Sequence, residues 1–479
     1  DGITYAKGAS VLKQLVAWVG REQFLAGVQA YFAEHSWGNT TLADLFAKLE
    51  VTSGRDLSAW EQQWLQTAGV NTMHPIVALD QDGSYSSVVV EQTANPEHPT
   101  LRSHRLAVGL YDHTDDGLVR RHRVELDVSG ERTDVPELVG EKQPDLLLIN
   151  DDDLTYTKVR LDERSRNTLV SSIGSLPSLT RALCWTAATD MLRDAELPTR
   201  DYVELALSGV GHESVIAVVQ NVLVTTRTAI DQYADPAERM LLSARWASAV
   251  RQLAGAAEAG SDMQLALARA WATAAASHEH TMQIQSLLDG ADDVLPGLTV
   301  DTDLRWHLLQ RLVIAGEAGD AAIDAELQRD NTATGQRQAT FARAARPTAD
   351  AKAAAWLAAV ESDDLPNALL TATVRGFAQP EQRELVRPYV LRYLDSVAKI
   401  WAERTHDSAQ TLIVGLFPRV LADAETATAV RGWLDTAELP DAPRRLVVEG
   451  LADLDRALRA QACDRGASSL PLHTGHPGG

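Results

Sequence analysis

The string in this sequence that comes nearest to a metal site is His278-Glu279-His280-Thr281-Met282. Two imidazoles on one helix face a single zinc ion when they are four residues apart, as in His-Glu-x-x-His. Position 282, where the second histidine would be needed, is a methionine. His278 and His280 are two residues apart, so they point to different sides of a helix. We therefore expect a solvated helix end here and no zinc site.

Other groups of reactive or ligating side chains are weak candidates for a functional site. Residues 151–153 are three consecutive aspartates, but calcium loops need a more regular ligand order with a closing glutamate, so we expect a solvated loop. Serines, histidines and aspartates are scattered without a Gly-x-Ser-x-Gly elbow, and glycine-rich phosphate loops are absent from the sequence. Guanidinium forks suit carboxylates, although exposed arginines more often form surface ion pairs. Four arginines are candidates for contacting a substrate carboxylate: Arg343, Arg346, Arg375 and Arg383.

The most informative segment is residues 2–12, Gly-Ile-Thr-Tyr-Ala-Lys-Gly-Ala-Ser-Val-Leu. Tyr5 stands just before the Lys7-Gly8 pair, at the start of a predicted helix. A phenol donates a hydrogen bond without having to ionise at neutral pH. Such a donor stabilises the oxyanion formed in amide hydrolysis, and losing it costs on the order of 10²–10³ in rate. Taken alone, Tyr5 also fits a half-buried aromatic residue at a helix start.

This segment resembles the part of M1-family (gluzincin) zinc aminopeptidases that holds their catalytic tyrosine, with Tyr5 in that position and Lys7-Gly8 in register. The resemblance covers residues 2–465 and is closest to bacterial members of the actinobacterial type. Further similar segments follow in order: Tyr31, Trp37-Gly38-Asn39, Leu42–Leu45, Trp60, Trp64, Gly69, Asn150–Arg160, Leu183-Cys184-Trp185, Asp190-Met191 and Asp301–Trp306. An ordered series of this extent is more specific than the tyrosine motif alone.

The resemblance implies a peptide hydrolase that removes N-terminal amino acids from peptide substrates with one zinc ion. In the family, the zinc ligands and the residues that grip the substrate's amino group lie upstream of the tyrosine. These positions would precede Asp1, so we expect this chain to hold no catalytic zinc and to be inactive without an N-terminal half as its partner. Tyr5 is then the one catalytic residue assigned within the chain. A cytoplasmic location is also implied.

Composition argues against two other kinds of partner. The 479 residues carry 44 basic and 66 acidic side chains, a formal net charge of −22, which repels the phosphates of nucleic acids. The sequence contains no apolar run of the roughly 18–20 residues needed to span a membrane. Its two cysteines, Cys184 and Cys463, are far apart and form no CxxC motif. We expect two buried thiols in a reducing compartment.

Hydrophobic periodicity divides the chain into three zones and a tail. Helical spacing in residues 1–70 is followed by short strands and Gly/Asp turns in 71–160, and helical spacing returns over 161–465. We predict a multidomain, mainly α protein. Its parts are the helical tail of a catalytic domain (thermolysin-like, by the resemblance), a small β-sandwich and a HEAT-like α-solenoid. Residues 466–479 are rich in turn formers and are predicted to be a flexible tail.

An alternative from a different functional class remains open. Curved helical repeats commonly bind protein partners, so the chain is also compatible with a non-catalytic helical-repeat interaction protein. The sequence upstream of the tyrosine distinguishes the two hypotheses. A His-Glu-x-x-His motif there, with its downstream glutamate, favours the enzyme, and a natural chain that begins near Asp1 favours the interaction protein. An upstream half that lacks these ligands would indicate a third alternative, a pseudo-enzyme.

Overall fold

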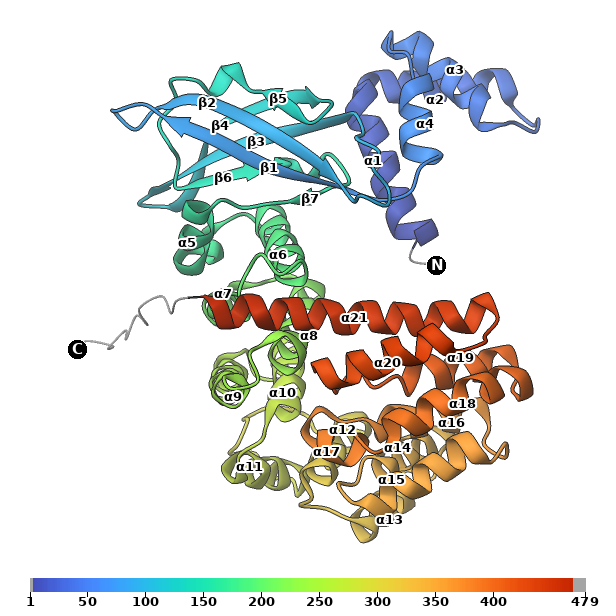
Figure 1. Cartoon of the computed structure of the whole chain (residues 1–479). Coiled ribbons are helices and arrows are strands. Elements are labelled where there is room, and N and C mark those ends of the chain that lie inside the picture. Colours follow the sequence, from blue (N-terminus) through green and yellow to red (C-terminus); the bar gives the residue numbers. More distant parts are fainter. Residues whose placement is uncertain (1–2, 468–479) are drawn as a thin grey trace. The chain divides into compact units, whose positions relative to one another are not determined.

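A computed structural model describes residues 3–467 of the chain, and nearly all of the predicted tail at 466–479 lies outside these described residues (Figure 1). The chain forms two compact units. Unit 1 comprises Asp1–Met191 and Ser208–Ser214, and unit 2 comprises Leu192–Leu207 and Val215–Gly479. The division falls near the end of helix α6 (Ser178–Arg193), with the following helix α7 (Thr199–Gly209) mostly in unit 2.

Unit 1 begins with helices whose inner faces share one apolar core. These elements are η1 (Ile3–Lys7), α1 (Gly8–Val19), α2 (Arg21–His35), α3 (Leu42–Ser53) and α4 (Ser58–Leu65). Gly20, with a φ of 91°, ends α1, as its position after the periodic apolar residues predicts. Thr41 begins α3, and its backbone N–H donates to Asp44 Oδ2 at 2.7 Å. The core contains Val11, Leu15, Val19, Phe46, Leu49, Leu57, Trp60 and Trp64.

The outer faces of these helices expose many apolar side chains. In α2, Gly27 is the one fully buried residue. Eight of the 21 exposed large hydrophobic side chains in the described part of the chain fall within residues 3–65. They are Tyr5, Leu12, Leu25, Phe32, Trp37, Leu42, Val51 and Leu65. Such a concentration of exposed apolar side chains is typical of a surface that another protein segment covers.

Two small sheets follow the helices in unit 1, one behind the other in the view of Figure 1. The first has the strand order β5-β2-β1-β7 and the second β4-β3-β6. Asp-Gly sequences predict the two hairpin turns, where Gly83 and Gly117 have φ values of 80° and 98°. The strands are β1 (Asn71–Leu79), β2 (Tyr85–Ala94), β3 (His104–Thr114), β4 (Gly117–Val128), β5 (Arg132–Asp134), β6 (Leu146–Ile149) and β7 (Lys158–Val159).

Short helices complete unit 1 around these sheets. Helix α5 (Glu163–Ser172) packs against β6, where Leu147 N donates to Ser165 Oγ at 2.9 Å. All four residues of β6 are buried, as the apolar run Leu146–Ile149 predicts. The helical elements are η2 (Pro136–Leu138), η3 (Asp151–Asp153), α5 (Glu163–Ser172), η4 (Ile173–Ser175), the first part of α6, and η5 (Val210–His212).

Unit 2 is built from helices, and seven of them form a continuous row in which each helix contacts the next. The row consists of α8 (Ile216–Thr228), α10 (Asp262–Ala274), α12 (Thr302–Ala315), α14 (Ala333–Ala344), α16 (Asn367–Phe377), α19 (His406–Gly415) and α21 (Asp441–Gly466). The remaining helical elements are η6 (Ala229–Tyr233), α9 (Arg239–Ala256), α11 (His278–Leu288), α13 (Asp320–Arg329), α15 (Ala349–Trp356), η7 (Leu357–Glu361), η8 (Pro380–Gln382), α17 (Arg383–Val386), α18 (Tyr389–Glu403) and α20 (Ala424–Thr436).

The last helix of unit 2 returns to the unit's beginning. Asp464, near the end of α21, is fully buried and accepts hydrogen bonds from the backbone N–H groups of Arg200 at 3.0 Å and Asp235 at 2.8 Å. These bonds join segments more than 200 residues apart in the sequence. The chain is therefore mainly helical with two small sheets, in agreement with the predicted class.

Candidate active site

Tyr5 lies in η1, the single π-helical turn that precedes α1. Its side chain is 75% exposed, so it is not the half-buried aromatic residue that the sequence also allows. Leu12, seven residues on, shares the exposed side of the helix, while Val11 and Leu15 enter the core. Within residues 3–467, no hydrogen bond to the Tyr5 hydroxyl is present. The phenol is thus available to an external hydrogen-bond acceptor.

The described residues do not fit a zinc ion. A catalytic zinc needs three protein ligands, and in residues 3–467 no group of three or more His, Cys, Asp or Glu side chains could hold a metal ion. The His278 side chain is 78% exposed, with Nδ1 3.7 Å from a Glu317 carboxylate oxygen. The His280 ring instead packs edge-on against Trp271, with 6.0 Å between ring centroids. The two imidazoles therefore have separate surroundings, as their spacing predicts.

The three aspartates at 151–153 form ion pairs and do not form the solvated loop expected from the sequence. Asp151 is fully buried, where it accepts from Tyr111 Oη at 2.8 Å and from Arg120 Nη1 at 2.7 Å. Asp153 accepts from Lys13 Nζ at 2.8 Å, which joins η3 to α1. Because cations on other elements neutralise these carboxylates, the run fastens the sheets to the N-terminal helices.

Three of the four candidate arginines have structural partners. Arg343 pairs with Asp324 at 2.7 Å, and Arg346 pairs with Asp320. Arg383 donates to three backbone carbonyls at 2.6–2.9 Å, and burial lowers the pKa of its guanidinium. The expectation of surface ion pairs is correct for the first two, whereas the third stabilises the helix packing.

Arg375 is the one of the four that lines a cavity. The cavity has a volume of about 510 Å³ and lies in unit 2 among α10, α12, α14 and α16. Three further arginines line it, none of which the sequence singles out: Arg269, Arg311 and Arg337. They are far apart in sequence, and the helix row is what brings them together.

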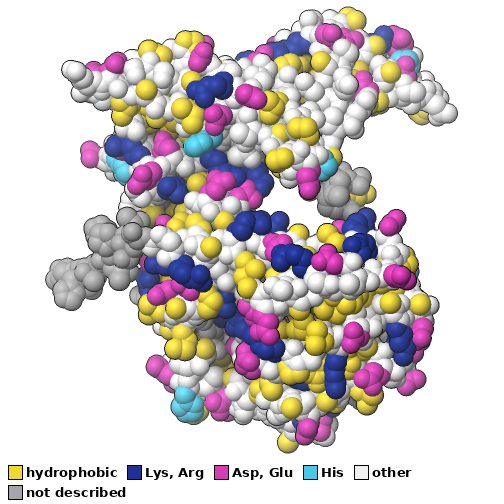
Figure 2. Space-filling view, in the orientation of Figure 1, with side chains coloured by type: hydrophobic (Ala, Val, Ile, Leu, Met, Phe, Trp, Pro, Cys, Tyr) yellow, Lys and Arg dark blue, Asp and Glu magenta, His cyan; other side chains and the backbone are white. Residues whose placement is uncertain are grey.

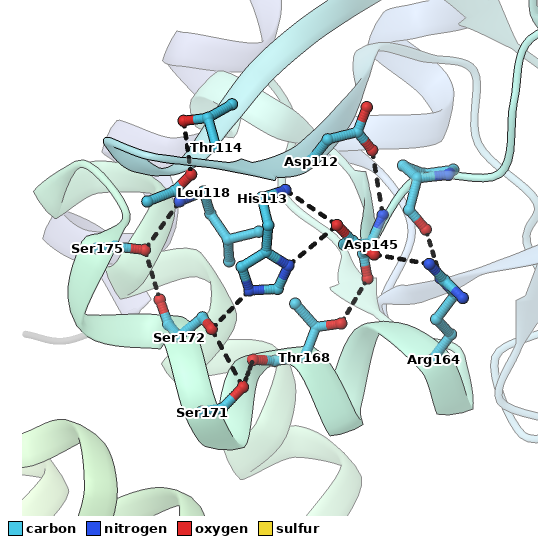
Figure 3. Close-up of polar contacts among 12 residues, drawn as sticks. Asp112, His113, Thr114, Leu118, Asp145, Arg164, Thr168, Ser171, Ser172 and Ser175 are labelled. Atoms are coloured by element: carbon cyan, nitrogen blue, oxygen red, sulfur yellow. Dashed lines mark hydrogen bonds and ion pairs between the residues drawn. The ribbon is translucent and has the colours of Figure 1, made fainter.

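The structure also joins a serine, a histidine and an aspartate that the sequence leaves unconnected (Figure 3). His113 Nδ1 lies 2.9 Å from Asp145 Oδ2, and His113 Nε2 lies 2.8 Å from Ser172 Oγ. This is the hydrogen-bond order of a hydrolytic triad. The residues come from the end of β3, the segment before β6 and the last position of α5, beside a groove of about 750 Å³.

The surroundings of this cluster indicate a structural clamp. A triad also needs backbone N–H donors for the oxyanion, but the N–H that follows Ser172, that of Ile173, donates to Leu169 O. Asp145 is occupied as well, since it accepts from Arg164 Nη2 at 2.6 Å and from the backbone N–H of His113 at 2.9 Å. The hydrogen bonds therefore fasten α5 to the second sheet.

The clamp predicts a pH-dependent contribution to stability. Burial alone would raise the pKa of Asp145, but hydrogen bonds from His113 and the ion pair with Arg164 outweigh it, so the folded pKa is lowered. The contribution is then present above the ordinary carboxyl pKa and lost as pH falls through the lower folded pKa. We expect Asp145→Asn to reduce the free energy of unfolding by about 1 kcal/mol at neutral pH.

Urea unfolding of the wild type and Asp145→Asn at neutral and acid pH measures this difference. It should shrink once Asp145 is protonated in the wild type. Asp116→Asn, on the exposed turn between β3 and β4, is the matched control and should change little at either pH. An equal loss for both variants would contradict the clamp.

The comparison with known proteins identifies the family. The Peptidase family M1 domain matches residues 1–64, and the ERAP1-like C-terminal domain matches residues 146–456. The chain is 52% identical over 476 residues to aminopeptidase N of Streptomyces lividans, an alignment that covers 98% of this chain and 55% of that protein. The chain belongs to the M1 peptidase family. The family and the bacterial type predicted from the sequence are thereby confirmed.

Other relatives match shorter parts of the chain. Tricorn protease-interacting factor F2 of Thermoplasma volcanium is 25% identical over 215 residues, 43% of this chain and 24% of that protein. Aminopeptidase 2 of Candida albicans is 36% identical over 84 residues, 18% of this chain and 9% of that protein. The chain thus spans about half the length of its Streptomyces relative and a smaller share of the others.

Two further expectations concern the membrane and the thiols. In the described part of this M1 chain, no helix is both long and apolar enough to cross a bilayer. Cys184 is fully buried, and burial raises the pKa of its thiol. Cys463 is only partly buried, so the prediction of two buried thiols is wrong for that residue.

Proposed function

We propose that this chain is the C-terminal part of a zinc-dependent aminopeptidase that removes N-terminal amino acids from peptides. The observation that carries the proposal is the 52% identity to a Streptomyces aminopeptidase N over 98% of the chain. We also propose that the chain alone is inactive, and that the intact enzyme acts in the cytoplasm. The alternative of a non-catalytic helical-repeat protein is not favoured, since the relative with this coverage is an aminopeptidase.

The proposed domain organisation follows the sequence periodicity. Residues 1–70 would be the helical end of the catalytic domain, 71–160 a β-sandwich and 161–465 an α-solenoid. The match of the M1 domain to residues 1–64 supports the first boundary, because the strands begin at Asn71. The presence of two sheets and a row of contacting helices is compatible with the other two assignments.

We assign Tyr5 the role of oxyanion donor. As the scissile amide is attacked, negative charge develops on the former carbonyl oxygen. The Tyr5 O–H would donate a hydrogen bond to this oxygen, and that bond is stronger in the transition state than in the ground state. Two features support this role: the side chain is 75% exposed, and it lies in a π-turn, an element frequent at functional sites.

The zinc ligands and the amino-group binding residues are proposed to lie outside these 479 positions. A complementary N-terminal half would cover the exposed apolar side chains of residues 3–65, including Leu12, Phe32 and Trp37. Leu12, Phe32 and Trp37 are each at least 50% exposed, which fits a surface that is buried once the catalytic domain is complete.

Reconstitution tests the proposed function. The chain would be mixed with the N-terminal half of the same protein, and release of a chromophore from an aminoacyl anilide would be followed. We expect hydrolysis only on mixing, its loss on chelation and its recovery with zinc. Two halves that fold and associate without any hydrolysis would contradict the proposal.

A further inference from the structure

The cavity in unit 2 is lined by one arginine from each of four neighbouring helices in the row. Arg269 lies on α10, Arg311 on α12, Arg337 on α14 and Arg375 on α16. Consecutive helices of the row are in contact, so the four guanidinium groups gather around one space. This arrangement is unusual in a chain with a net charge of −22, whose visible surface in unit 2 mixes acidic and basic side chains (Figure 2).

Two of these four arginines are not neutralised. Arg269 pairs with Asp303, and Arg311 donates to Glu381 at 2.7 Å. Arg337, by contrast, donates only to the hydroxyl of Thr334, at 2.7 Å. Within the described residues, neither Arg337 nor Arg375 has a carboxylate partner. Two guanidinium forks on adjacent helices are therefore available to a ligand.

Asp303, which pairs with Arg269, is the one acidic residue of the lining, and the rest of the lining is uncharged and partly apolar. His307 is partly buried, its Nε2–H donates to Arg269 O at 3.0 Å, and burial lowers its pKa to about 4. It is therefore neutral at neutral pH. Ile314, Phe341 and Ala372 supply apolar surface beside the arginines. The volume of about 510 Å³ lies within the range of roughly 300–1,000 Å³ typical of small-ligand sites.

We propose that this cavity binds a carboxylate group of a peptide, held by Arg337 and Arg375. A guanidinium fork matches a carboxylate in two parallel hydrogen bonds, and the apolar lining suits the side chain of the same amino acid. The carboxylate can be the C-terminus of the peptide or an acidic side chain. This inference rests on the proposed function only in taking peptides as ligands, because the binding site lies wholly within unit 2.

Peptide binding to the 479-residue chain itself tests the inference. Short peptides would be titrated calorimetrically in three forms: with a free C-terminus, with an amidated C-terminus, and with an acidic side chain replaced by its amide. We expect removal of the recognised carboxylate to weaken binding roughly tenfold or more, and higher salt to weaken it further. The form that loses affinity identifies which carboxylate is bound.

Variants of the lining give the matching control. Arg337→Ala and Arg375→Ala should each weaken peptide binding roughly tenfold or more. Arg375→Lys should weaken binding less than Arg375→Ala, because lysine keeps the positive charge but cannot form the two parallel hydrogen bonds of a guanidinium. Arg343→Ala, on the same helix as Arg337 but paired with Asp324 outside the cavity, should bind like the wild type. Arg337 and Arg375 are exposed and Arg343 is partly exposed, so we expect all three alanine variants to fold, which thermal unfolding verifies.

The outcomes separate this inference from the proposed function. The inference would be overturned by any of three results: equal affinity for all peptide forms, equal binding by the wild type and the variants, or tighter binding of inorganic phosphate than of any peptide. None of these results depends on catalysis. Carboxylate binding without activity after reconstitution would support the inference and overturn the aminopeptidase proposal. Activity without carboxylate binding would support the aminopeptidase proposal and overturn the inference.

Discussion

Replacing Tyr5 with phenylalanine is expected to lower kcat of the reconstituted enzyme by roughly 10²–10³-fold. The substitution removes one hydrogen-bond donor to the developing oxyanion and keeps the ring. Because this bond forms mainly in the transition state, kcat and kcat/KM should fall together while KM changes little. The side chain is 75% exposed and lies outside the core of α1–α4, so stability and association with the N-terminal half should be unaffected.

Steady-state kinetics of the aminoacyl anilide assay, with the zinc content matched between samples, measure this effect. Tyr31→Phe is the control, since Tyr31 is a second tyrosine of the N-terminal helices and its hydroxyl already contacts Thr40 Oγ1. We expect that variant to retain its kcat. An unchanged rate for Tyr5→Phe would make Tyr5 a surface residue without a catalytic role, even if the enzyme reconstitutes.

Local features of the fold could be predicted from the sequence because short-range physics determines them. Gly20 ends α1, Thr41 begins α3, and Gly83 and Gly117 adopt the positive φ of hairpin turns. The apolar run Leu146–Ile149 becomes a strand buried on both faces. In each case the residue's own conformational preference agrees with its place in the fold.

The polar sites could not be predicted from the sequence, because each depends on partners that are distant along the chain. Asp151 is neutralised by Arg120, and Ser172 meets His113, although each pair is separated by more than 30 residues. The arginine cavity arises because four helices align in a row, and the sequence points to only one of its arginines, Arg375. The role of Tyr5 depends on the family resemblance, because an exposed phenol at a helix start has no further local signature.

Glu213 supplies the second large expected effect, on stability. Its side chain is 1% exposed and accepts from Arg181 Nε at 2.6 Å and from Trp185 Nε1 at 2.8 Å, both on α6. These bonds attach the segment Ser208–Ser214 to unit 1, although the residues before and after it belong to unit 2. Glu213→Ala would leave the Arg181 guanidinium buried without its carboxylate. We expect a loss of about 3–5 kcal/mol in the free energy of unfolding.

Urea unfolding followed by tryptophan fluorescence would record this loss as a lower urea midpoint for unit 1, because the chain has two units. Glu204→Ala is the matched control: Glu204 pairs with Arg245 at 2.5 Å, but both side chains are more than a third exposed. Water screens such a pair, so its removal should cost less than about 1 kcal/mol. Glu213→Gln, which retains an acceptor for Trp185 and removes the charge, should lie between the two. If Glu213→Ala cost no more than Glu204→Ala, the buried pair would not be what holds Ser208–Ser214 in unit 1.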